Sequence, residues 1–159
     1  MVKNQEDQKS RLKQIEQTCV RLLAMREHSQ TELLNKLLAK GFEKNECLAV
    51  IEDLTLQGWQ SDLRYAESYA RYRIQKGYGP IYVAYELKKK GVSGFSLDEI
   101  VQKTIGSWMA LLEQVYIKKY GYDALLDHNE WARRSLFLMQ RGFPSSMIST
   151  LFEHLNIKL

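Results

Sequence analysis

Hydrophobic residues along the chain recur every three or four positions, which is the spacing of helices that bury one face. Leu33 and Leu37 form one such stripe. Leu48, Ile51 and Leu54 form the next, and all three are expected to point inward. The sequence has only two prolines, no Asn-Gly or Asp-Gly pair, and no long alternating run of the β-branched residues that favour strands. This pattern predicts an all-α fold.

Capping signals and glycines set the expected bounds of the helices. Ser29 and Glu32 have the spacing of a capping box, in which each side chain bonds the backbone N–H of the other residue. Gly41 stands where a helix commonly ends, and Pro80 suits the first position of a helix. Including the capping residues Ser29 and Ser96, the helices are expected at residues 6–27, 29–41, 44–57, 62–76, 80–90, 96–105, 107–120, 128–140 and 144–155.

A repeat appears when the sequence is aligned on its helix-ending glycines. Each of three glycines follows a leucine by four residues and precedes a hydrophobic residue that can fold back on the helix end. The three matches are Leu37, Gly41 and Phe42; Leu87, Gly91 and Val92; and Leu138, Gly142 and Phe143. Units this small bury little surface alone, so three tandem three-helix repeats are expected to stack into a solenoid-like array.

The expected domains follow this repeat. An N-terminal extension with the start of the first helix covers residues 1–17. The first repeat covers residues 18–60, the second 61–106 and the third 107–159. The second repeat is rich in basic residues and tyrosines.

The net charge of +4 is unevenly distributed along the chain. Residues 71–90 hold six basic side chains and one acid, Glu86, so this segment carries +5 and the rest of the chain −1. The same segment holds four of the nine tyrosines. Basic side chains interleaved with aromatic ones are typical of surfaces that bind nucleic acid or an acidic protein groove. The competing interpretation is a solvated helix face whose lysines serve solubility.

Periodicity separates the two faces of the helix expected at residues 80–90. At 100° per residue, Val83 and Leu87 lie on one side and are expected to point inward. Tyr82, Tyr85 and Lys89 fall together on the opposite side, where they predict a contact surface.

The preceding helix shows a different tyrosine pattern. Tyr65, Tyr69 and Tyr72 recur at helical spacing and are expected to be core residues. Arg73 adjoins this stripe and is interpreted as a partly buried structural arginine. Arg71 points elsewhere, which makes it the better surface candidate.

Signals of catalysis and cofactor binding are absent from the sequence. The three histidines show no metal-ligand spacing, and no glycine-rich phosphate-binding motif occurs. Cys19 and Cys47 make no disulfide framework and cannot alone form a structural zinc site. No apolar run approaches the roughly 18 residues of a membrane span, and the polar N-terminus is unlike a secretory signal. The sequence therefore predicts a cytoplasmic protein that is not an enzyme and holds no cofactor or metal.

Four segments of the chain carry a family resemblance. They are LLAMREHSQTELLNKLLAKGF, SDLRYAESYARYRIQKGYGP, ELKKKGV and SLFLMQRGF, in this order. They resemble the RecX family, bacterial regulatory proteins of the RecA recombinase, over residues 18–155. The most specific part runs from 62 to 80, and its signature residues are Asp62, Tyr65, Ala66, Tyr69, Arg73, Gly77, Tyr78, Gly79 and Pro80.

The resemblance implies an elongated, curved array of three-helix repeats without enzymatic activity. We expect the protein to be a monomer. Proteins of this family dock in the deep groove of the RecA–single-stranded DNA filament. They reduce filament extension, ATP hydrolysis, strand exchange and co-protease action, and so modulate recombination, DNA repair and the SOS response. The resemblance thus implies a RecA filament as the partner, while direct contact with single-stranded DNA stays open.

The basic segment and the resemblance lead to one hypothesis for the binding residues. The residues expected to contact acidic groups of the filament are Arg71, Lys76, Tyr82, Tyr85, Lys88, Lys89 and Lys90. The alternative is a helical module that binds nucleic acid directly, without specificity for RecA. A steep loss of affinity with salt would favour that alternative, because phosphate contacts release counterions.

Overall fold

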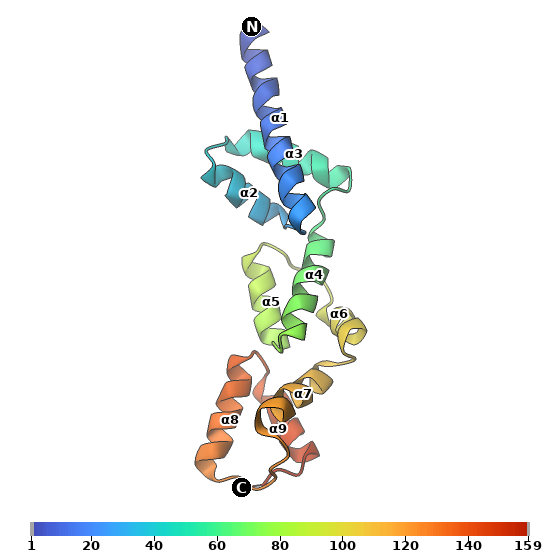
Figure 1. The fold of residues 1–159 in the computed structure, drawn as a ribbon, viewed down its shortest axis with the longest axis vertical. Coiled ribbons are helices and arrows are strands. Elements are labelled where there is room, and N and C mark those ends of the chain that lie inside the picture. Colours follow the sequence, from blue (N-terminus) through green and yellow to red (C-terminus); the bar gives the residue numbers. More distant parts are fainter. Residues whose placement is uncertain (1, 159) are drawn as a thin grey trace. The chain divides into compact units, whose positions relative to one another are not determined.

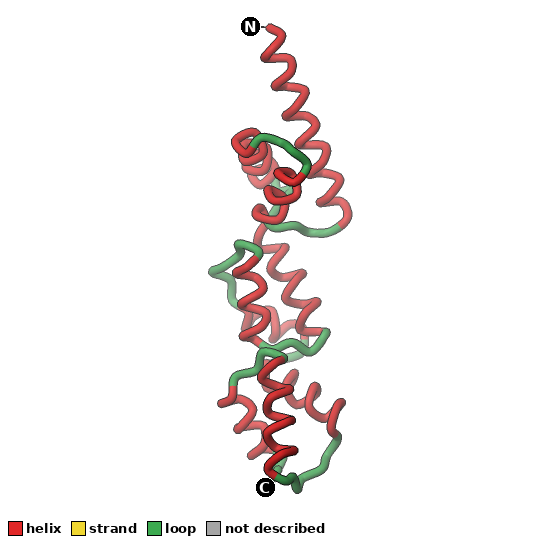
Figure 2. The backbone as a smooth tube through the Cα atoms, turned by 90° about the vertical axis from the view of Figure 1, so that its left-hand side faces the viewer, coloured by secondary structure: helices red, strands yellow, loops and turns green. Residues whose placement is uncertain are grey.

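The computed structural model describes residues 2–158, in which every regular element is a helix (Figures 1 and 2). In chain order the helices are α1 (Val2–Met25), α2 (Gln30–Ala39), α3 (Lys44–Leu56), α4 (Asp62–Gln75), α5 (Pro80–Lys89), α6 (Leu97–Thr104), α7 (Trp108–Tyr120), α8 (His128–Gln140) and α9 (Ser145–His154). Within this range the backbone pairs in strand fashion only at an isolated bridge between Leu125 and Lys158. The predicted all-α fold is confirmed.

The bounds of the helices agree closely with the sequence pattern. All but α1 begin and end within two residues of the expected positions. α1 begins at Val2 and not at residue 6, because the segment before residue 6 holds no glycine or proline that would stop a helix.

The predicted capping box at the start of α2 is present. The hydroxyl of Ser29 accepts a hydrogen bond from the Glu32 backbone N–H at 3.1 Å. The Glu32 carboxylate in turn accepts one from the Ser29 backbone N–H at 3.3 Å. Two backbone donors at the start of α2 are thereby satisfied, which fixes where the helix begins.

The described chain divides into two compact units, which are treated separately below. The first comprises the chain up to Ser68 together with Lys90–Val92. The second comprises Tyr69–Lys89 and the chain from Ser93 onward. α4 therefore contributes residues to both units.

α1, α2 and α3 enclose the core of the first unit. Its buried residues are Ile15, Cys19, Leu33, Leu37, Cys47, Ile51 and Leu54. Both cysteines are free thiols, and burial raises the pKa of Cys19 to about 11. Leu48 is 42% exposed, so its predicted inward orientation is wrong. Cys47, Ile51 and Leu54 occupy the buried face of α3, and the helical turn of 100° per residue carries Leu48 away from it.

The core that α7, α8 and α9 share in the second unit combines aliphatic side chains with several aromatic ones. The rings of Tyr116 and Phe152 are buried and meet edge to face, with centroids 5.6 Å apart. Trp131 packs against Phe152 in the same manner at 4.6 Å. The buried guanidinium of Arg134 donates a hydrogen bond to the Tyr116 hydroxyl at 2.9 Å, which satisfies both polar groups in the interior.

A helix that spans a membrane must be both long and apolar. Within residues 2–158, no helix has both properties.

Candidate partner-binding surface

A glycine-rich turn joins α4 to α5 in the second unit. Gly77 has a φ of 88°, in the left-handed region that favours glycine. Its N–H donates to the Ile74 carbonyl at 2.9 Å, and the Tyr78 N–H donates to the Arg73 carbonyl at 3.1 Å. These two bonds close the end of α4 in a Schellman motif. Pro80 then opens α5, as the sequence predicts.

Arg73 lies at the centre of a cluster of tyrosine rings beside this turn. Its guanidinium carbon is 5.4–5.7 Å from the ring centroids of four tyrosines, namely Tyr69, Tyr72, Tyr78 and Tyr82. Its Nε donates to the Tyr69 hydroxyl at 3.1 Å, and this hydrogen bond raises the pKa of the guanidinium. Tyr78 and Tyr82 also stack on each other, with ring centroids 4.2 Å apart. Arg73 is thus partly buried and orients the aromatic side chains around it.

The tyrosine stripe of α4 is only partly buried. Tyr65 is 3% exposed and Tyr69 is half-buried, but Tyr72 is 52% exposed, so its predicted core position is wrong. The buried row of α4 instead runs through Ala70 and Ile74, four residues apart. Ala70 and Ile74 are each two positions from Tyr72, which is about 160° around a helix, so Tyr72 lies on the opposite face.

The two faces of α5 divide as the sequence predicts, with one exception. Val83 and Leu87 are buried, at 0% and 4% exposure. Tyr85 and Lys89 are exposed, and the Lys89 ammonium lies 5.5 Å from the Tyr85 ring centroid. Tyr82 is half-buried by its stacking on the turn, so it supports the surface more than it extends it.

Lys90 differs from the other basic residues of the segment because it belongs to the first unit. Its ammonium lies 3.9 Å from the Glu32 carboxylate, which Arg26 also binds at 2.9 Å. Lys90 is half-buried there and already has an acidic partner within its own unit.

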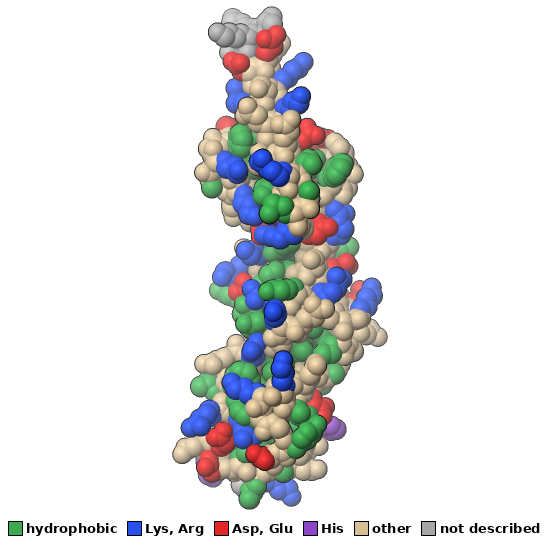
Figure 3. Space-filling view, viewed as in Figure 1, with side chains coloured by type: hydrophobic (Ala, Val, Ile, Leu, Met, Phe, Trp, Pro, Cys, Tyr) green, Lys and Arg blue, Asp and Glu red, His purple; other side chains and the backbone are tan. Residues whose placement is uncertain are grey.

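The remaining basic residues of the hypothesis stay exposed in the second unit. Arg71 and Lys76 are exposed near the end of α4, and Lys88 is exposed on α5 beside Lys89. Figure 3 shows basic side chains interspersed with hydrophobic ones over this part of the molecule. The second unit therefore presents cations and aromatic rings together, a combination suited to an anionic partner.

The signature residues divide between the two units. Asp62, Tyr65 and Ala66 lie in the first, where the Asp62 carboxylate accepts a hydrogen bond from the Gln30 N–H at 3.0 Å. The other six lie in the second. Of these, Gly79 is buried, and its N–H donates to the Arg141 carbonyl at 2.7 Å.

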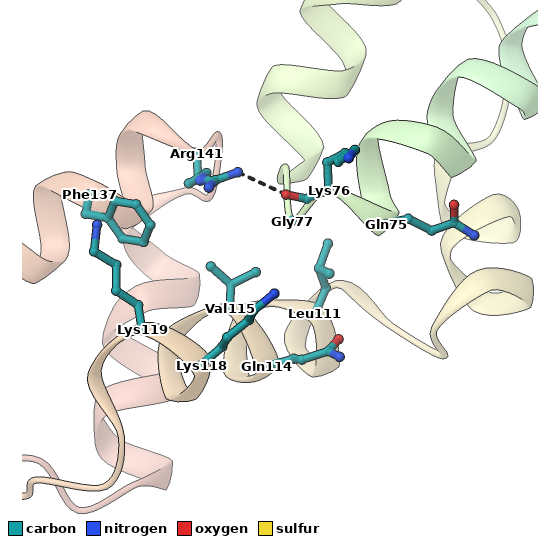
Figure 4. A pocket seen from close by; sticks show the side chains of 10 residues that line it. All are labelled: Gln75, Lys76, Gly77, Leu111, Gln114, Val115, Lys118, Lys119, Phe137 and Arg141. Carbon is teal, nitrogen blue, oxygen red and sulfur yellow. Dashed lines mark hydrogen bonds between the residues drawn. The ribbon is translucent and has the colours of Figure 1, made fainter.

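A cleft of about 360 Å³ in the second unit adds basic residues that the sequence analysis missed. It is lined by Gln75, Lys76, Gly77, Leu111, Gln114, Val115, Lys118, Lys119, Phe137 and Arg141 (Figure 4). Arg141 closes one side by donating to the Lys76 carbonyl at 3.0 Å. The pair Lys118 and Lys119 was visible in the sequence, but nothing local indicates that it faces Lys76, more than 40 residues earlier.

Residues 2–158 contain no group of three or more His, Cys, Asp or Glu side chains arranged to hold a metal ion.

Three family models match the chain in tandem. They describe the first, second and third three-helix domains of RecX, and they match residues 17–54, 61–99 and 109–152 respectively. The order and number of these domains agree with the repeat expected from the helix-ending glycines.

Similar proteins extend these matches over most of the chain. The regulatory protein RecX of Legionella pneumophila (strain Corby) is 33% identical over 136 residues, which cover 86% of this chain and 91% of that protein. The regulatory protein RecX of Pseudomonas fluorescens (strain SBW25) is 36% identical over 137 residues, covering 86% and 88%.

Two crystal structures share the fold. RecX from Lactobacillus salivarius aligns with a TM-score of 0.73 at 19% identity, over 94% of this chain and 99% of that one. A second regulatory protein RecX aligns with a TM-score of 0.76 at 18% identity, over 92% and 74%.

Proposed function

The chain belongs to the RecX family, a family of regulatory proteins and not of enzymes, and on this premise we propose that it regulates the RecA recombinase. In this proposal it binds the RecA–single-stranded DNA filament. Binding reduces filament extension, ATP hydrolysis, strand exchange and co-protease action, and thereby modulates recombination, repair and the SOS response.

The observation that carries the proposal is the exposed basic and aromatic surface of the second unit. Arg71, Tyr85, Lys88 and Lys89 are all exposed, and only Lys89 has a carboxylate nearby, at 3.9 Å from Glu86. An ion pair at this distance on the surface is weak, so Lys89 remains available to a partner. A tyrosine among cations supplies apolar contact area at low entropic cost.

Contacts within the chain favour a supporting role for two of the proposed residues. Tyr82 orders the turn through its stack on Tyr78, and Lys90 is paired with Glu32. We therefore assign direct contact to Arg71, Lys76, Tyr85, Lys88 and Lys89, and a supporting role to Tyr82 and Lys90.

The test is inhibition of single-stranded-DNA-dependent ATP hydrolysis by the cognate RecA, with this protein added below one-to-one stoichiometry. The variant Lys88→Glu/Lys89→Glu should need roughly tenfold more protein for equal inhibition, because two like charges then oppose an acidic partner. Lys103→Glu/Lys158→Glu is the matched control, since both of its lysines are exposed and the charge change is equal. Unchanged inhibition by a folded Lys88→Glu/Lys89→Glu variant would contradict the assignment of this surface.

The salt dependence of binding separates the proposal from direct binding of nucleic acid. A module that binds through about six phosphate contacts loses on the order of a thousandfold in affinity between about 50 and 200 mM salt. Tight binding to naked DNA with this salt dependence, and no effect on ATP hydrolysis by RecA, would favour the nucleic-acid module instead.

A further inference from the structure

The cleft beside the end of α4 carries an unbalanced positive charge. Its four basic residues are Lys76, Lys118, Lys119 and Arg141, and none of its lining residues is acidic. Among the described residues, no ion pair involves any of the four. Four cations around about 360 Å³ without a countercharge create a positive potential, which a concave surface concentrates. The natural occupant of this cleft is therefore an anionic group.

Neutral partners hold three of these cations in place. The Lys119 ammonium sits 3.6 Å from the Phe137 ring centroid, and the Lys76 ammonium 5.7 Å from that of Tyr72. The Arg141 guanidinium lies over the Tyr78 ring at 4.8 Å. Aromatic rings position cations without neutralising them, so the charges stay available to a ligand.

Apolar residues from α7 form another wall of the cleft. Figure 4 shows Leu111, Val115 and Lys118 projecting from α7 toward the end of α4 at Gly77. Val115 packs closely there, since a Cβ atom added to Gly77 would lie 3.0 Å from its Cγ2. The amides of Gln75 and Gln114 border the same space and can bond a peptide backbone. The cleft thus offers cations, an aliphatic wall and amide groups together.

This composition favours carboxylates on a peptide over the phosphates of a nucleic acid. Binding of single-stranded nucleic acid relies on an exposed ring face on which a base can stack. Phe137 is the only aromatic residue that lines the cleft, and the Lys119 ammonium covers one face of its ring while the Tyr120 ring meets it edge on at 5.9 Å. An aliphatic wall contributes nothing to phosphate binding, but it suits a leucine or valine side chain between two acids.

We propose that this cleft binds an acidic peptide segment of a partner protein, with an aliphatic side chain against Leu111 and Val115 and carboxylates at Lys118 and Arg141. The identification of that partner with the RecA filament rests on the proposed function. The binding chemistry of the cleft does not: the cleft shares Lys76 with the surface proposed above, but none of the lysines of α5 lines it.

A peptide titration tests the cleft without RecA. The probe is the fluorescein-labelled peptide Glu-Leu-Asp-Glu-Leu-Asp, followed by fluorescence anisotropy, with Lys-Leu-Lys-Lys-Leu-Lys as the charge-reversed control. Lys118→Glu should weaken binding of the acidic peptide by at least about tenfold, because a carboxylate then faces the carboxylates of the ligand. Lys103→Glu on α6, an exposed lysine outside the cleft, should leave the affinity unchanged. Lys118 is exposed, and far-UV circular dichroism verifies that both variants fold.

Three results would overturn the proposal. The first is equal affinity of Lys118→Glu and Lys103→Glu for the acidic peptide. The second is tighter binding of labelled oligothymidylate than of the peptide, with the same dependence on Lys118, which would assign the cleft to phosphates. The third is inhibition of RecA by a protein that binds no acidic peptide, which would leave the proposed function standing. Peptide binding at Lys118 without any effect on RecA would instead support the cleft and remove the proposed function.

Discussion

In each unit, a loop that ends one helix is hydrogen-bonded to the start of another helix. That helix is α2 in the first unit and α5 in the second, and different atoms make the bond in the two cases. At α2, the Ser29 hydroxyl donates to the Lys90 carbonyl at 2.9 Å. At α5, the Gly79 backbone N–H donates to the Arg141 carbonyl at 2.7 Å. Lys90 and Arg141, whose carbonyls accept these bonds, each stand directly before a helix-ending glycine, Gly91 and Gly142 respectively. The same junction is therefore built once with a side chain and once with the main chain alone.

The atoms that face each glycine follow from this difference. The three atoms nearest to a Cβ atom added to Gly91 all belong to the side chain of Thr31, namely Oγ1, Cβ and Cγ2. A Cβ atom added to Gly142 would lie 2.6 Å from the Tyr82 backbone nitrogen, and one added to Gly79 would lie 2.6 Å from the Gly142 carbonyl oxygen. The Thr31 Oγ1 can rotate away from the added methyl group, but backbone held by hydrogen bonds cannot. The first junction therefore tolerates change better than the second.

The largest loss of stability is expected from a substitution at Gly79, whose backbone is not in the left-handed region. Alanine suits its backbone conformation, so a loss of stability would come from the close contact with Gly142 alone. We expect Gly79→Ala to lower the free energy of unfolding by about 3 kcal/mol, because backbone must move to admit the methyl group. Urea unfolding followed by circular dichroism measures this loss, and hydrogen exchange should locate it in α5 and α8.

Gly94→Ala is the control for this variant. Gly94 has a φ of 82° but nothing within 4 Å of an added Cβ, so only the conformational cost of about 1 kcal/mol applies. A Gly79→Ala variant as stable as the natural chain would show that the two loops do not pack as closely as the contact with Gly142 requires.

A smaller loss, and a rescue, are expected at Gly91 in the first unit. Gly91→Ala should lower the free energy of unfolding by about 2 kcal/mol, from its φ of 76° and the contact with Thr31. Adding Thr31→Ala removes Oγ1 and should restore about 1 kcal/mol, which a double-mutant cycle measures as coupling. Gly79→Ala has no corresponding rescue, because its obstacle is backbone. Strictly additive effects at Gly91 and Thr31 would refute the side-chain junction.

Local signals made most of the fold predictable from the sequence. The Ser29–Glu32 capping box and the helix-ending Gly41, Gly91 and Gly142 are defined by residues close together in the chain, and the structure contains all of them. The predicted burial of Leu48 and Tyr72 was wrong, because their exposure depends on which face of each helix the neighbouring helices cover. Periodicity gives the relative angle between residues but does not say where the partner helix lies.

The candidate site was less accessible to sequence reasoning, because tertiary contacts decide which basic residues remain available. Lys90 adjoins Lys89 in the chain, yet Glu32 pairs with it from more than 50 residues away. Lys118 joins Lys76 in one cleft across a similar separation in the chain. A charge count along the sequence identifies the basic segment. It cannot show that Lys90 is already paired or that Lys118 belongs to the site.

The smallest expected effect is a pH dependence of the free energy of unfolding, which only the junction at α2 should show. His28 precedes the Ser29 cap, whereas Tyr78 precedes Gly79 and is stacked on Tyr82. His28 is 1% exposed, with Nδ1 3.0 Å from the Arg26 carbonyl and Nε2 2.9 Å from the Lys36 ammonium. Burial lowers the pKa of this imidazole, and the charges of Arg26 and Lys36 lower it further, while the Arg26 carbonyl and Glu32 act in the opposite sense.

A lowered pKa means that the folded protein favours neutral His28, so its contribution to stability is complete above the unfolded value of 6.5 and declines below it. Between about pH 7.5 and 5.5 the free energy of unfolding should fall by at most about 1.4 kcal/mol, the limit for one proton over one pH unit. Glu32 does not interfere. Although burial alone would raise its pKa, hydrogen bonds from Arg26 and the Ser29 N–H hold that pKa below 4.5, so its contribution is lost only at lower pH.

His28→Gln keeps a donor and an acceptor without titrating and should flatten the decline. Hydrogen exchange at both pH values should show the loss in α2 and not in α5, because only the first junction carries a buried imidazole. A decline of equal size in α5 would mean that the pH dependence arises elsewhere.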